Sequence, residues 1–312
     1  MRHRHLGRSG LRVSRLALGT MTWGSGVDHE GARDQLALFV EAGGTLLDTA
    51  YGYAGGASEE IIGTLLGDVV ARDDVVLCTK SGISRQGDDR VVDTSRRALV
   101  RQLDASLERL GTDHVDLWLV HAWSDETPLD ETLSALAQAV SSGRATYVGV
   151  SNYSGWQTAR ALTLLEQERV SLVANQTHYS LLHRVPEDEL VPAALALGFG
   201  LLPWSPLGRG VLSGKYRSGV PSDSRAGSRD FPHFAERYLD ERSMTITEAV
   251  VTAARGLQVS PAEVALAWVR DRPGVTAPVL GARTLPQLRT ALASEDLELP
   301  PEIVEALDEV SD

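Results

Sequence analysis

Cysteine and basic charge are both scarce in this chain of 312 residues. Its single cysteine, Cys78, excludes a disulfide within the chain and a cysteine-based zinc site, and its apolar surroundings predict a small buried hydrophobe. Lys and Arg number 30 against 42 Asp and Glu, which gives a net charge of −12. Nucleic acid and anionic lipid both require a basic surface, so neither is an expected partner.

Long hydrophobic runs are also missing. The most apolar stretch, Leu190 to Trp204, is interrupted by proline and glycine and is too short to span a bilayer. The first ten residues carry positive charge but no apolar segment, so we expect no secretory signal and a cytoplasmic protein. An apolar content of 43% with 23% charged residues is typical of a globular protein and excludes a disordered or fibrous chain.

Short apolar runs recur along the whole chain, each followed by a segment of helical periodicity. They lack the alternation of half-exposed strands, which predicts parallel strands buried on both faces. The runs are Arg15–Gly19, Thr45–Asp48, Val75–Lys80, Val115–His121, Ala145–Ser151, Leu172–Gln176, Phe199–Trp204 and Ala277–Gly281.

The segments between these runs carry clear helix signals. Leucines and a valine share one stripe of Asp93–Leu110, and Gly111 marks its C-terminal end. Ser260-Pro-Ala-Glu263 is a capping box with proline at the first helical position, and it opens a helix through Val269. Alternating strands and helices indicate βαβ units.

The fold class predicted from eight such units is α/β, a (β/α)8 TIM barrel that forms a single domain over residues 1–312. An open doubly wound sheet is the structural alternative. Met1–Val13 predicts an N-terminal β-hairpin that plugs the bottom of the barrel, and extra helices follow at the C-terminal end. The stretch Ser218–Pro232, rich in Gly, Ser, Pro and Arg, is the best candidate for a mobile loop, and we expect two helices after it.

Polar residues stand where the predicted strands end, and in a barrel these ends meet at one rim. Lys80 ends a buried strand, and its charge requires a carboxylate, which Asp48 supplies from the neighbouring strand. The alternative is that Lys80 and Asp48 form a salt bridge with a purely structural role. Tyr53 favours a catalytic interpretation, because a nearby ammonium is expected to lower the pKa of a phenol towards neutral pH. Taken alone, Tyr53 would be better interpreted as a packed loop aromatic.

His121 ends the fourth predicted strand. An isolated histidine there is more often a core residue than a catalyst, and only the shared rim favours a functional role. Asp48, Tyr53, Lys80 and His121 together suit the polarisation and protonation of a carbonyl oxygen. A lysine and a phenol are poor neighbours for Zn²⁺, so no metal is expected.

Two loops could bind phosphate. Gly208-Arg-Gly-Val-Leu-Ser-Gly-Lys215 follows the seventh predicted strand and nearly matches two known phosphate-binding patterns without satisfying either, so an ordinary Gly-rich loop stays possible. Gly281-Ala-Arg-Thr284 follows the eighth and opens a helix over Leu285–Leu292. Barrels often bind phosphate at these two places. Trp204 offers a flat face for a planar ring, or it caps the barrel core.

These residues resemble the aldo-keto reductase family over the whole length of the chain. The motifs that carry the resemblance are Leu18-Gly-Thr-Met-Thr-Trp-Gly24, Leu47-Asp-Thr-Ala-Tyr-Gly-Tyr53, Ser58-Glu-Glu-Ile-Ile-Gly63, Gly143-Arg-Ala-Thr-Tyr-Val-Gly-Val-Ser-Asn152 and Trp204-Ser-Pro-Leu-Gly-Arg-Gly-Val-Leu-Ser-Gly-Lys215. The resemblance implies a (β/α)8 barrel and reversible reduction of aldehyde or ketone carbonyls, with NADPH as the usual cofactor.

The resemblance also implies a role for each matching residue. Tyr53 would protonate the carbonyl oxygen, Lys80 paired with Asp48 would lower its pKa, and His121 would orient the substrate. Trp204 would stack on the nicotinamide. The remaining residues implied in cofactor binding are Gly19, Thr20, Met21, Asp48, Ser151, Asn152, Gln176, Ser205, Pro206, Leu207, Gly208, Arg209, Gly210, Lys215, Gly281, Arg283 and Gln287.

One departure bears on the cofactor. Many family members carry a Lys-Ser pair after the last strand, followed by an arginine, and these residues bind the 2′-phosphate. Here the segment begins at Gly281 and resembles another branch, in which Arg283 would bind that phosphate and Gln287 the adenine. NADPH is therefore the expected cofactor, with NADH possible.

The sequence leaves the substrate and the oligomeric state open. Trp23, Tyr51 and Trp123 are expected to form apolar walls of a pocket for a small carbonyl compound. A regulatory subunit that senses nicotinamide cofactors with little turnover, as some channel β-subunits of this fold do, is the alternative function. A third interpretation takes Lys80 as the Schiff-base lysine of a barrel aldolase.

Overall fold

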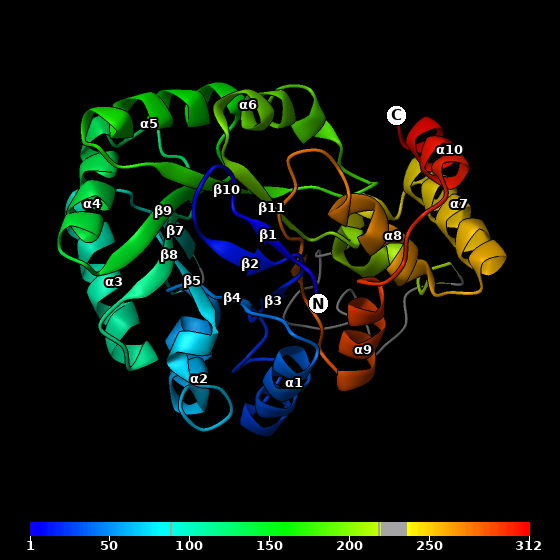
Figure 1. Cartoon of the computed structure of the whole chain (residues 1–312), viewed down its shortest axis with the longest axis horizontal. Helices are drawn as coiled ribbons and strands as arrows, with labels where there is room; N and C mark the ends of the chain where they lie inside the picture. The colour runs from blue at the N-terminus through cyan, green and yellow to red at the C-terminus, as the bar shows by residue number, and fades with distance from the viewer. Residues whose placement is uncertain (88, 218, 220–235) are drawn as a thin grey trace.

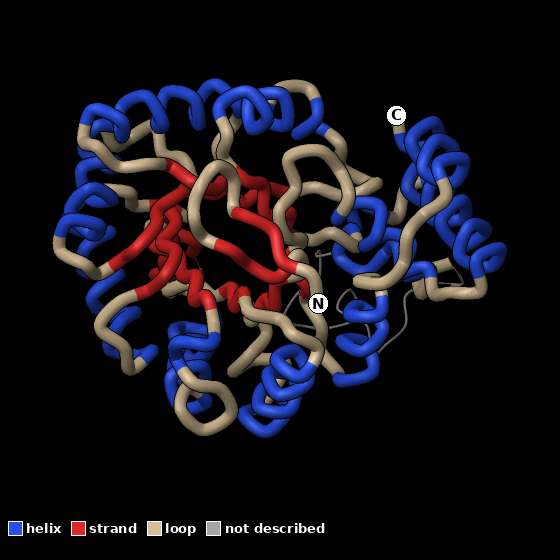
Figure 2. Tube along the Cα trace, in the orientation of Figure 1, coloured by secondary structure: helices blue, strands red, loops and turns tan. Residues whose placement is uncertain are grey.

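A computed structural model describes residues 1–87, 89–217, 219 and 236–312 of the chain. Within these residues eight parallel strands form one sheet at the centre of the molecule, with helices around it (Figures 1 and 2). In spatial order the strands are β11 (Gly200–Trp204), β10 (Leu172–His178), β9 (Ala145–Ser151), β8 (Val115–Val120), β5 (Val76–Ser81), β4 (Leu46–Asp48), β3 (Ala17–Gly19) and β12 (Val279–Leu280).

The sheet closes on itself between β11 and the segment that leads into β12. The amide of Thr276 donates to the carbonyl of Leu201 at 2.8 Å, and the amide of Leu201 donates to the carbonyl of Gly274 at 2.9 Å. The prediction of a (β/α)8 barrel is confirmed, and the open doubly wound sheet is wrong. Each predicted apolar run overlaps one of the observed strands, because strands inside a closed barrel are buried on both faces.

Helices cover the outside of the barrel. Gly111 ends α3 in the left-handed conformation with φ 63°, as the sequence predicts. Ser260 and Glu263 make the predicted capping box at the start of α8. The helices are α1 (His29–Glu41), α2 (Ala57–Leu65), α3 (Arg96–Leu110), α4 (Leu129–Ser141), α5 (Gly155–Gln167), α6 (Leu190–Leu197), α7 (Glu241–Leu257), α8 (Pro261–Arg270), α9 (Leu285–Ala293) and α10 (Pro301–Ser311).

The N-terminal hairpin joins β1 (His3–His5) to β2 (Arg12–Ser14) and crosses the near opening of the barrel in Figure 1. Its Leu6 and Val13 are fully buried in the same apolar cluster as Cys78. The hairpin therefore plugs the bottom of the barrel as predicted, and Cys78 is the buried hydrophobe that the sequence indicates. Burial raises the pKa of the Cys78 thiol well above its ordinary value, so the thiol is inert.

A second hairpin, absent from the predictions, joins β6 (Ile83–Gln86) to β7 (Asp89–Val92) between β5 and α3. The two helices expected after the seventh strand are α7 and α8. Apart from Gly219, the stretch Ser218–Pro232 lies outside the described residues, so the prediction of a mobile loop there stays a prediction.

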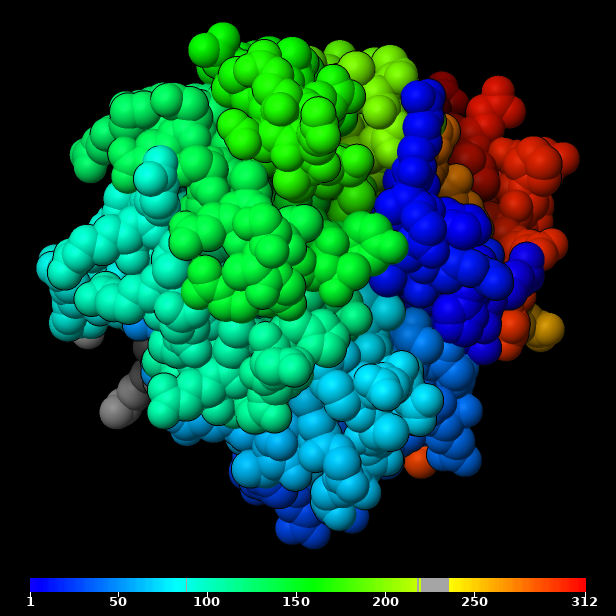
Figure 3. Space-filling view, turned by 60° about the vertical axis from the view of Figure 1, so that its left-hand side comes forward, coloured from blue at the N-terminus to red at the C-terminus, as the bar shows by residue number. Residues whose placement is uncertain are grey.

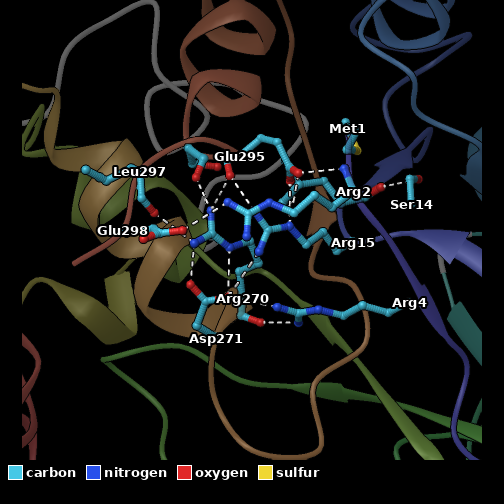
Figure 4. Close-up of polar contacts among 12 residues, drawn as sticks. Met1, Arg2, Arg4, Ser14, Arg15, Arg270, Asp271, Glu295, Leu297 and Glu298 are labelled. Atoms are coloured by element: carbon cyan, nitrogen blue, oxygen red, sulfur yellow. Dashed lines mark hydrogen bonds and ion pairs between the residues drawn. The ribbon is translucent and has the colours of Figure 1, made fainter. Parts of the chain in front are cut away.

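At the bottom of the barrel the N-terminal segment lies beside C-terminal segments of the chain (Figure 3). Buried charges hold the segment after α9 in place. Arg15 Nε donates to both carboxylate oxygens of Glu295 at 3.0 Å, and Arg270 donates to the backbone carbonyl of Leu297 at 2.8 Å (Figure 4). Arg270 is fully buried, so each of its donors needs an acceptor within the protein.

Candidate active site

The carboxyl ends of the barrel strands bring the predicted catalytic residues together. In the parallel register Gly19 of β3 lies beside Asp48 of β4, and Lys80 of β5 lies beside Leu119 of β8. His121 follows β8, and its amide donates to the carbonyl of Ser81 at 2.8 Å. The polar residues that end these strands therefore share one rim, opposite the N-terminal hairpin.

Lys80 is fully buried and makes three short polar contacts. Its Nζ donates to Asp48 Oδ2 at 2.8 Å, to the carbonyl of Thr49 at 2.7 Å and to Tyr53 Oη at 3.3 Å. Gln176 Nε2 donates to the other carboxylate oxygen of Asp48 at 2.6 Å. The ammonium is thus fixed in place, and one of its hydrogens points at the phenol.

The electrostatics of Tyr53 correct one expectation. Burial raises the pKa of Tyr53 above its ordinary value, and the charge of Lys80, which acts in the opposite direction, does not outweigh it. The phenol is therefore fully protonated at neutral pH. For Lys80, burial lowers the pKa, but the attraction of Asp48 and Tyr53 outweighs burial and leaves it above the ordinary value. The charged neighbours of Tyr53 could be identified from the sequence, but its burial could not. Burial has the larger effect on the Tyr53 pKa.

His121 completes this group. Its ring meets that of Tyr53 edge to face, with centroids 5.9 Å apart. Burial, together with the positive charges of Lys80 and Arg90, holds the pKa of His121 well below its ordinary value, so the ring is neutral. Its Nδ1 is buried and has no hydrogen-bond partner. A buried polar atom without a partner is costly, and it marks a place where a bound group can supply the missing contact.

Two residues that the sequence analysis did not single out support the Tyr53 loop. Glu59 is fully buried and accepts from Thr79 Oγ1 at 2.7 Å and from Arg109 at 3.1 Å. Arg109 also donates to the carbonyl of Tyr51 at 3.0 Å, and its guanidinium lies over the Tyr51 ring. Glu59 stands in the Ser58-Glu-Glu motif, and a carboxylate in an otherwise apolar helix face is the signal that could have identified it.

Next to this group, the rim carries the residues expected to contact the nicotinamide. Trp204 Nε1 donates to Asn152 Oδ1 at 3.0 Å, and Asn152 Nδ2 donates to the carbonyl of His121 at 2.9 Å. Ser151 Oγ donates to the carbonyl of Gln176 at 3.0 Å. Asn152 has φ 61°, in the left-handed region, and such strain is common at functional sites.

One face of Trp204 is already covered. The ring of His178 stacks on it with a centroid distance of 4.2 Å, and His183 stacks on the far side of His178 at 4.2 Å. Tyr238 Oη lies 3.0 Å from His178 Nε2. Sequence analysis did not single out these histidines, since their contact depends on the fold. His178 is two residues after Gln176 on β10 and so shares its face, which is the available signal. A nicotinamide ring would use the other face of Trp204.

The loop after β11 has the chemistry of a phosphate cradle. Ser205, Gly208, Arg209 and Gly210 all have positive φ, between 52° and 93°. A side chain at Gly210 would meet Lys215 Nζ at 3.0 Å, so the ammonium lies directly against this bare stretch of backbone. Basic side chains beside a tightly turned loop in an acidic protein fit a pyrophosphate. Pro206 and Leu207 lie inside the same turn.

The other expected cofactor residues border this loop and the start of the barrel. The amide of Arg283 donates to Gln287 Oε1 at 3.0 Å, and both residues are at the N-terminal end of α9, after Gly281. Thr20 is fully buried, and its Oγ1 donates to the carbonyl of Asp48 at 3.0 Å. Its neighbours are Gly19, which ends β3, and the half-buried Met21.

The three expected pocket aromatics divide between the core and the rim. Trp23 is fully buried in the main core and donates from Nε1 to Gln35 of α1 at 3.0 Å, so its assignment to the pocket wall is wrong for this structure. Its place after a strand end did not determine the direction of its side chain. Tyr51 is half-buried beneath Arg109, and Trp123 is half-buried against Tyr153.

Two negative findings concern the described part of the chain. In residues 1–87, 89–217, 219 and 236–312, no group of three metal-ligating side chains is close enough together to hold a metal ion. Over the same residues, no helix is both long and apolar enough to cross a bilayer.

Comparison with known proteins identifies the family. The sequence model described as "Aldo/keto reductase family" matches residues 15–312. The chain belongs to the aldo/keto reductase family. It is 37% identical to the "Uncharacterized oxidoreductase YrpG" of Bacillus subtilis, over 99% of this chain and 96% of that protein. Membership supports a nicotinamide-dependent oxidoreductase that acts on small carbonyl compounds.

Two further relatives carry different functional names. A "Probable voltage-gated potassium channel subunit beta" of Oryza sativa is 35% identical, over 99% of this chain and 96% of that protein. An "L-glyceraldehyde 3-phosphate reductase" of Escherichia coli K12 is 34% identical, over 92% and 86%. The similarity thus extends both to proteins named as enzymes and to proteins named as channel subunits.

Proposed function

We propose that this protein reduces aldehyde or ketone carbonyls to alcohols with NADPH, and that Tyr53 donates the proton to the carbonyl oxygen. One observation carries the proposal. The buried ammonium of Lys80 lies 2.8 Å from Asp48 and 3.3 Å from the Tyr53 hydroxyl, at the rim where a neutral His121 leaves a ring nitrogen without a partner.

The protonation states suit proton donation. Tyr53 keeps its proton at neutral pH because burial raises its pKa. When Tyr53 gives up this proton, the phenolate faces the Lys80 ammonium, which stabilises the new charge. His121 is neutral and can orient a carbonyl by a hydrogen bond without competing for the proton. When bound, the cofactor supplies the hydride to the carbonyl carbon.

The remaining rim residues hold the cofactor in this proposal. Ser151, Asn152 and Gln176 bind the carboxamide, and the open face of Trp204 contacts the ring. Arg283 binds the 2′-phosphate of NADPH, with Gln287 at the adenine. The pyrophosphate would lie in the loop after β11, against Ser205, Leu207, Gly208 and Gly210, with Arg209 and Lys215 beside it. The other residues proposed to contact the cofactor are Gly19, Thr20, Met21, Pro206 and Gly281.

The state of Lys80 argues against an aldolase. A Schiff base requires an accessible neutral amine, whereas Lys80 is fully buried and its pKa lies above the ordinary value. The second candidate function is a cofactor-sensing regulatory subunit, which the similarity to the rice protein named as a channel subunit favours.

Two measurements separate these functions. NADPH binding is followed by fluorescence titration, and turnover is then assayed with a panel of aldehydes and ketones. The proposed enzyme binds NADPH and oxidises it when a carbonyl is added. Tight NADPH binding with negligible turnover across the panel would favour the regulatory subunit and contradict the proposal.

A further inference from the structure

The hairpin of β6 and β7 places two arginines directly opposite each other. In its antiparallel register Arg85 pairs with Arg90, while Ile83 pairs with Val92 nearer the base. Residues that face each other in such a pair have side chains on the same side of the hairpin, about 5 Å apart at Cβ. Like charges in this position destabilise a hairpin. The arrangement therefore calls for a compensating anion.

The described residues supply no such anion. Both arginines are exposed, and neither forms an ion pair with a carboxylate in the part of the chain that the structure describes. Other surface arginines of this acidic chain do find carboxylates, as Arg144 does with Asp104 and Arg217 with Glu248. What distinguishes Arg85 and Arg90 is that they face each other directly across the hairpin.

The base of this hairpin belongs to the rim of the active site. Its first strand begins three residues after Lys80, and the amide of His121 donates to the carbonyl of Ser81 at 2.8 Å. On its other side, a Cβ atom at Gly52 would lie 3.0 Å from the carbonyl oxygen of Ile83, so the hairpin also contacts the Tyr53 loop. The base of the hairpin therefore adjoins both the Tyr53 loop and the segment that carries His121.

The charge of Arg90 reaches this site. It is one of the positive charges that lower the pKa of His121, after burial and Lys80. The field of Arg90 therefore acts on the place where a substrate would lie. A guanidinium binds carboxylate or phosphate oxygens through two parallel hydrogen bonds, and a pair of guanidiniums suits a group with several such oxygens.

We propose that Arg85 and Arg90 form an anion-binding subsite beside the catalytic rim, which selects carbonyl substrates that carry a carboxylate or phosphate group away from the reacting carbon. This inference rests on the proposed carbonyl reductase function. It names the substrate class that the function leaves open, and it explains why the hairpin keeps an arrangement that is unfavourable without a ligand.

Matched substrates test the subsite. We compare kcat/KM for para-carboxybenzaldehyde with that for its neutral methyl ester, and for glycolaldehyde phosphate with that for glycolaldehyde. The two anionic members distinguish carboxylate from phosphate recognition. The variants are Arg85→Gln, Arg90→Gln and the double variant. Arg97→Gln is the control, since Arg97 is exposed on α3 and has no ion pair with any described residue.

We expect the double variant to lower kcat/KM about 10-fold or more for at least one anionic substrate, because charge-assisted hydrogen bonds are lost. For the neutral substrates, kcat/KM should change by no more than about twofold in the double variant. In Arg97→Gln, kcat/KM should change by no more than about twofold for the anionic and the neutral substrates alike. Arg90→Lys should restore part of the loss. The preference for the anionic member should also shrink with added salt. Equal losses for charged and neutral substrates, or no loss in the double variant, would overturn the subsite.

A binding measurement keeps this test independent of turnover. Benzoate and phenyl phosphate are titrated into the NADPH-loaded protein, and the change in cofactor fluorescence reports their binding. The subsite predicts that the double variant weakens at least one of these anions about 10-fold while NADPH affinity is unchanged. Equal anion affinity in wild type and double variant would contradict it. Absent turnover with wild-type anion binding intact would contradict only the proposed carbonyl reductase function.

Discussion

The two ends of the barrel both bury charged side chains, and they differ in how completely those charges are satisfied. At the bottom, Arg15 donates to both oxygens of Glu295 and to its backbone carbonyl, at 2.6 to 3.0 Å (Figure 4). At the catalytic rim Lys80 is equally well paired, yet His121 Nδ1 next to it has no partner. The rim also contains Asn152 and Ser205 in strained left-handed conformations.

This difference separates stability from function. A buried network in which each donor has an acceptor holds the segment after α9 against the bottom of the barrel and has no capacity left for a ligand. A rim with an unpartnered nitrogen and strained backbone has given up some stability for binding capacity. In barrels generally, residues at the bottom serve stability and residues at the strand ends serve chemistry. Mutations at the two ends should therefore produce different kinds of loss.

The largest combined effect is expected for Lys80→Met. Removing the ammonium leaves the Asp48 carboxylate buried with Gln176 as its remaining donor, which should lower the free energy of unfolding by about 3–5 kcal/mol. Turnover should fall by roughly 100-fold or more, because the Tyr53 phenolate loses its stabilising charge. Denaturant unfolding and steady-state kinetics check the two losses. An unchanged kcat/KM would show that Lys80 is purely structural.

Arg15→Met tests the bottom of the barrel. It leaves the nearly buried Glu295 carboxylate without its main partner and should lower the free energy of unfolding by about 3 kcal/mol. The value of kcat/KM, measured well below the melting temperature, should stay within about twofold of wild type. Stability measured by urea unfolding and activity are compared in the same preparation. A large loss of kcat/KM in folded Arg15→Met protein would contradict the proposal that the bottom of the barrel serves stability and the rim serves catalysis.

Arg283→Ala tests the cofactor assignment. Loss of a charge-assisted contact to the 2′-phosphate should weaken NADPH binding about 10- to 100-fold and leave NADH binding nearly unchanged. Fluorescence titration with each cofactor measures both affinities. Equal losses for NADPH and NADH would remove Arg283 from this role.

The smallest effect concerns the histidine stack behind Trp204. Burial, with help from His183 and nearby arginines, lowers the pKa of His178 to about 3. The unfolded chain therefore binds an extra proton between pH 6.5 and 3, and stability is lost as pH falls through that range. As the pH falls from about 7.5 to about 5.5, the titration of His178 should lower the free energy of unfolding by about 1.4 kcal/mol. His178→Gln should flatten that part of the stability profile, whereas His3→Gln, at an exposed position, should leave it unchanged.

Much of the fold could be predicted from sequence, because strands inside a closed barrel are continuous apolar runs and several of them end in polar residues at the rim. The hairpin that carries Arg85 and Arg90 was missed, since its residues are polar, half-exposed and few. The direction of the Trp23 side chain depends on packing against α1, which strand periodicity does not describe.

The residues that form the candidate site could be predicted more easily than their pKa values. Asp48, Tyr53, Lys80 and His121 meet where the strand ends indicate. The direction of the Tyr53 pKa shift was wrong, because burial is a property of the folded chain. The stack of His178 and His183 on Trp204 likewise depends on distant segments. The single-domain organisation and the cytoplasmic location stay predictions.

The central claim is that the Tyr53 hydroxyl supplies the proton that completes carbonyl reduction. Single-turnover oxidation of protein-bound NADPH by an aldehyde tests it most directly, in wild type and in Tyr53→Phe, after fluorescence titration shows equal cofactor occupancy. We expect rapid oxidation in wild type and a rate at least about 100-fold lower in Tyr53→Phe, with NADPH affinity retained. Equal single-turnover rates in the two proteins at neutral pH would contradict it.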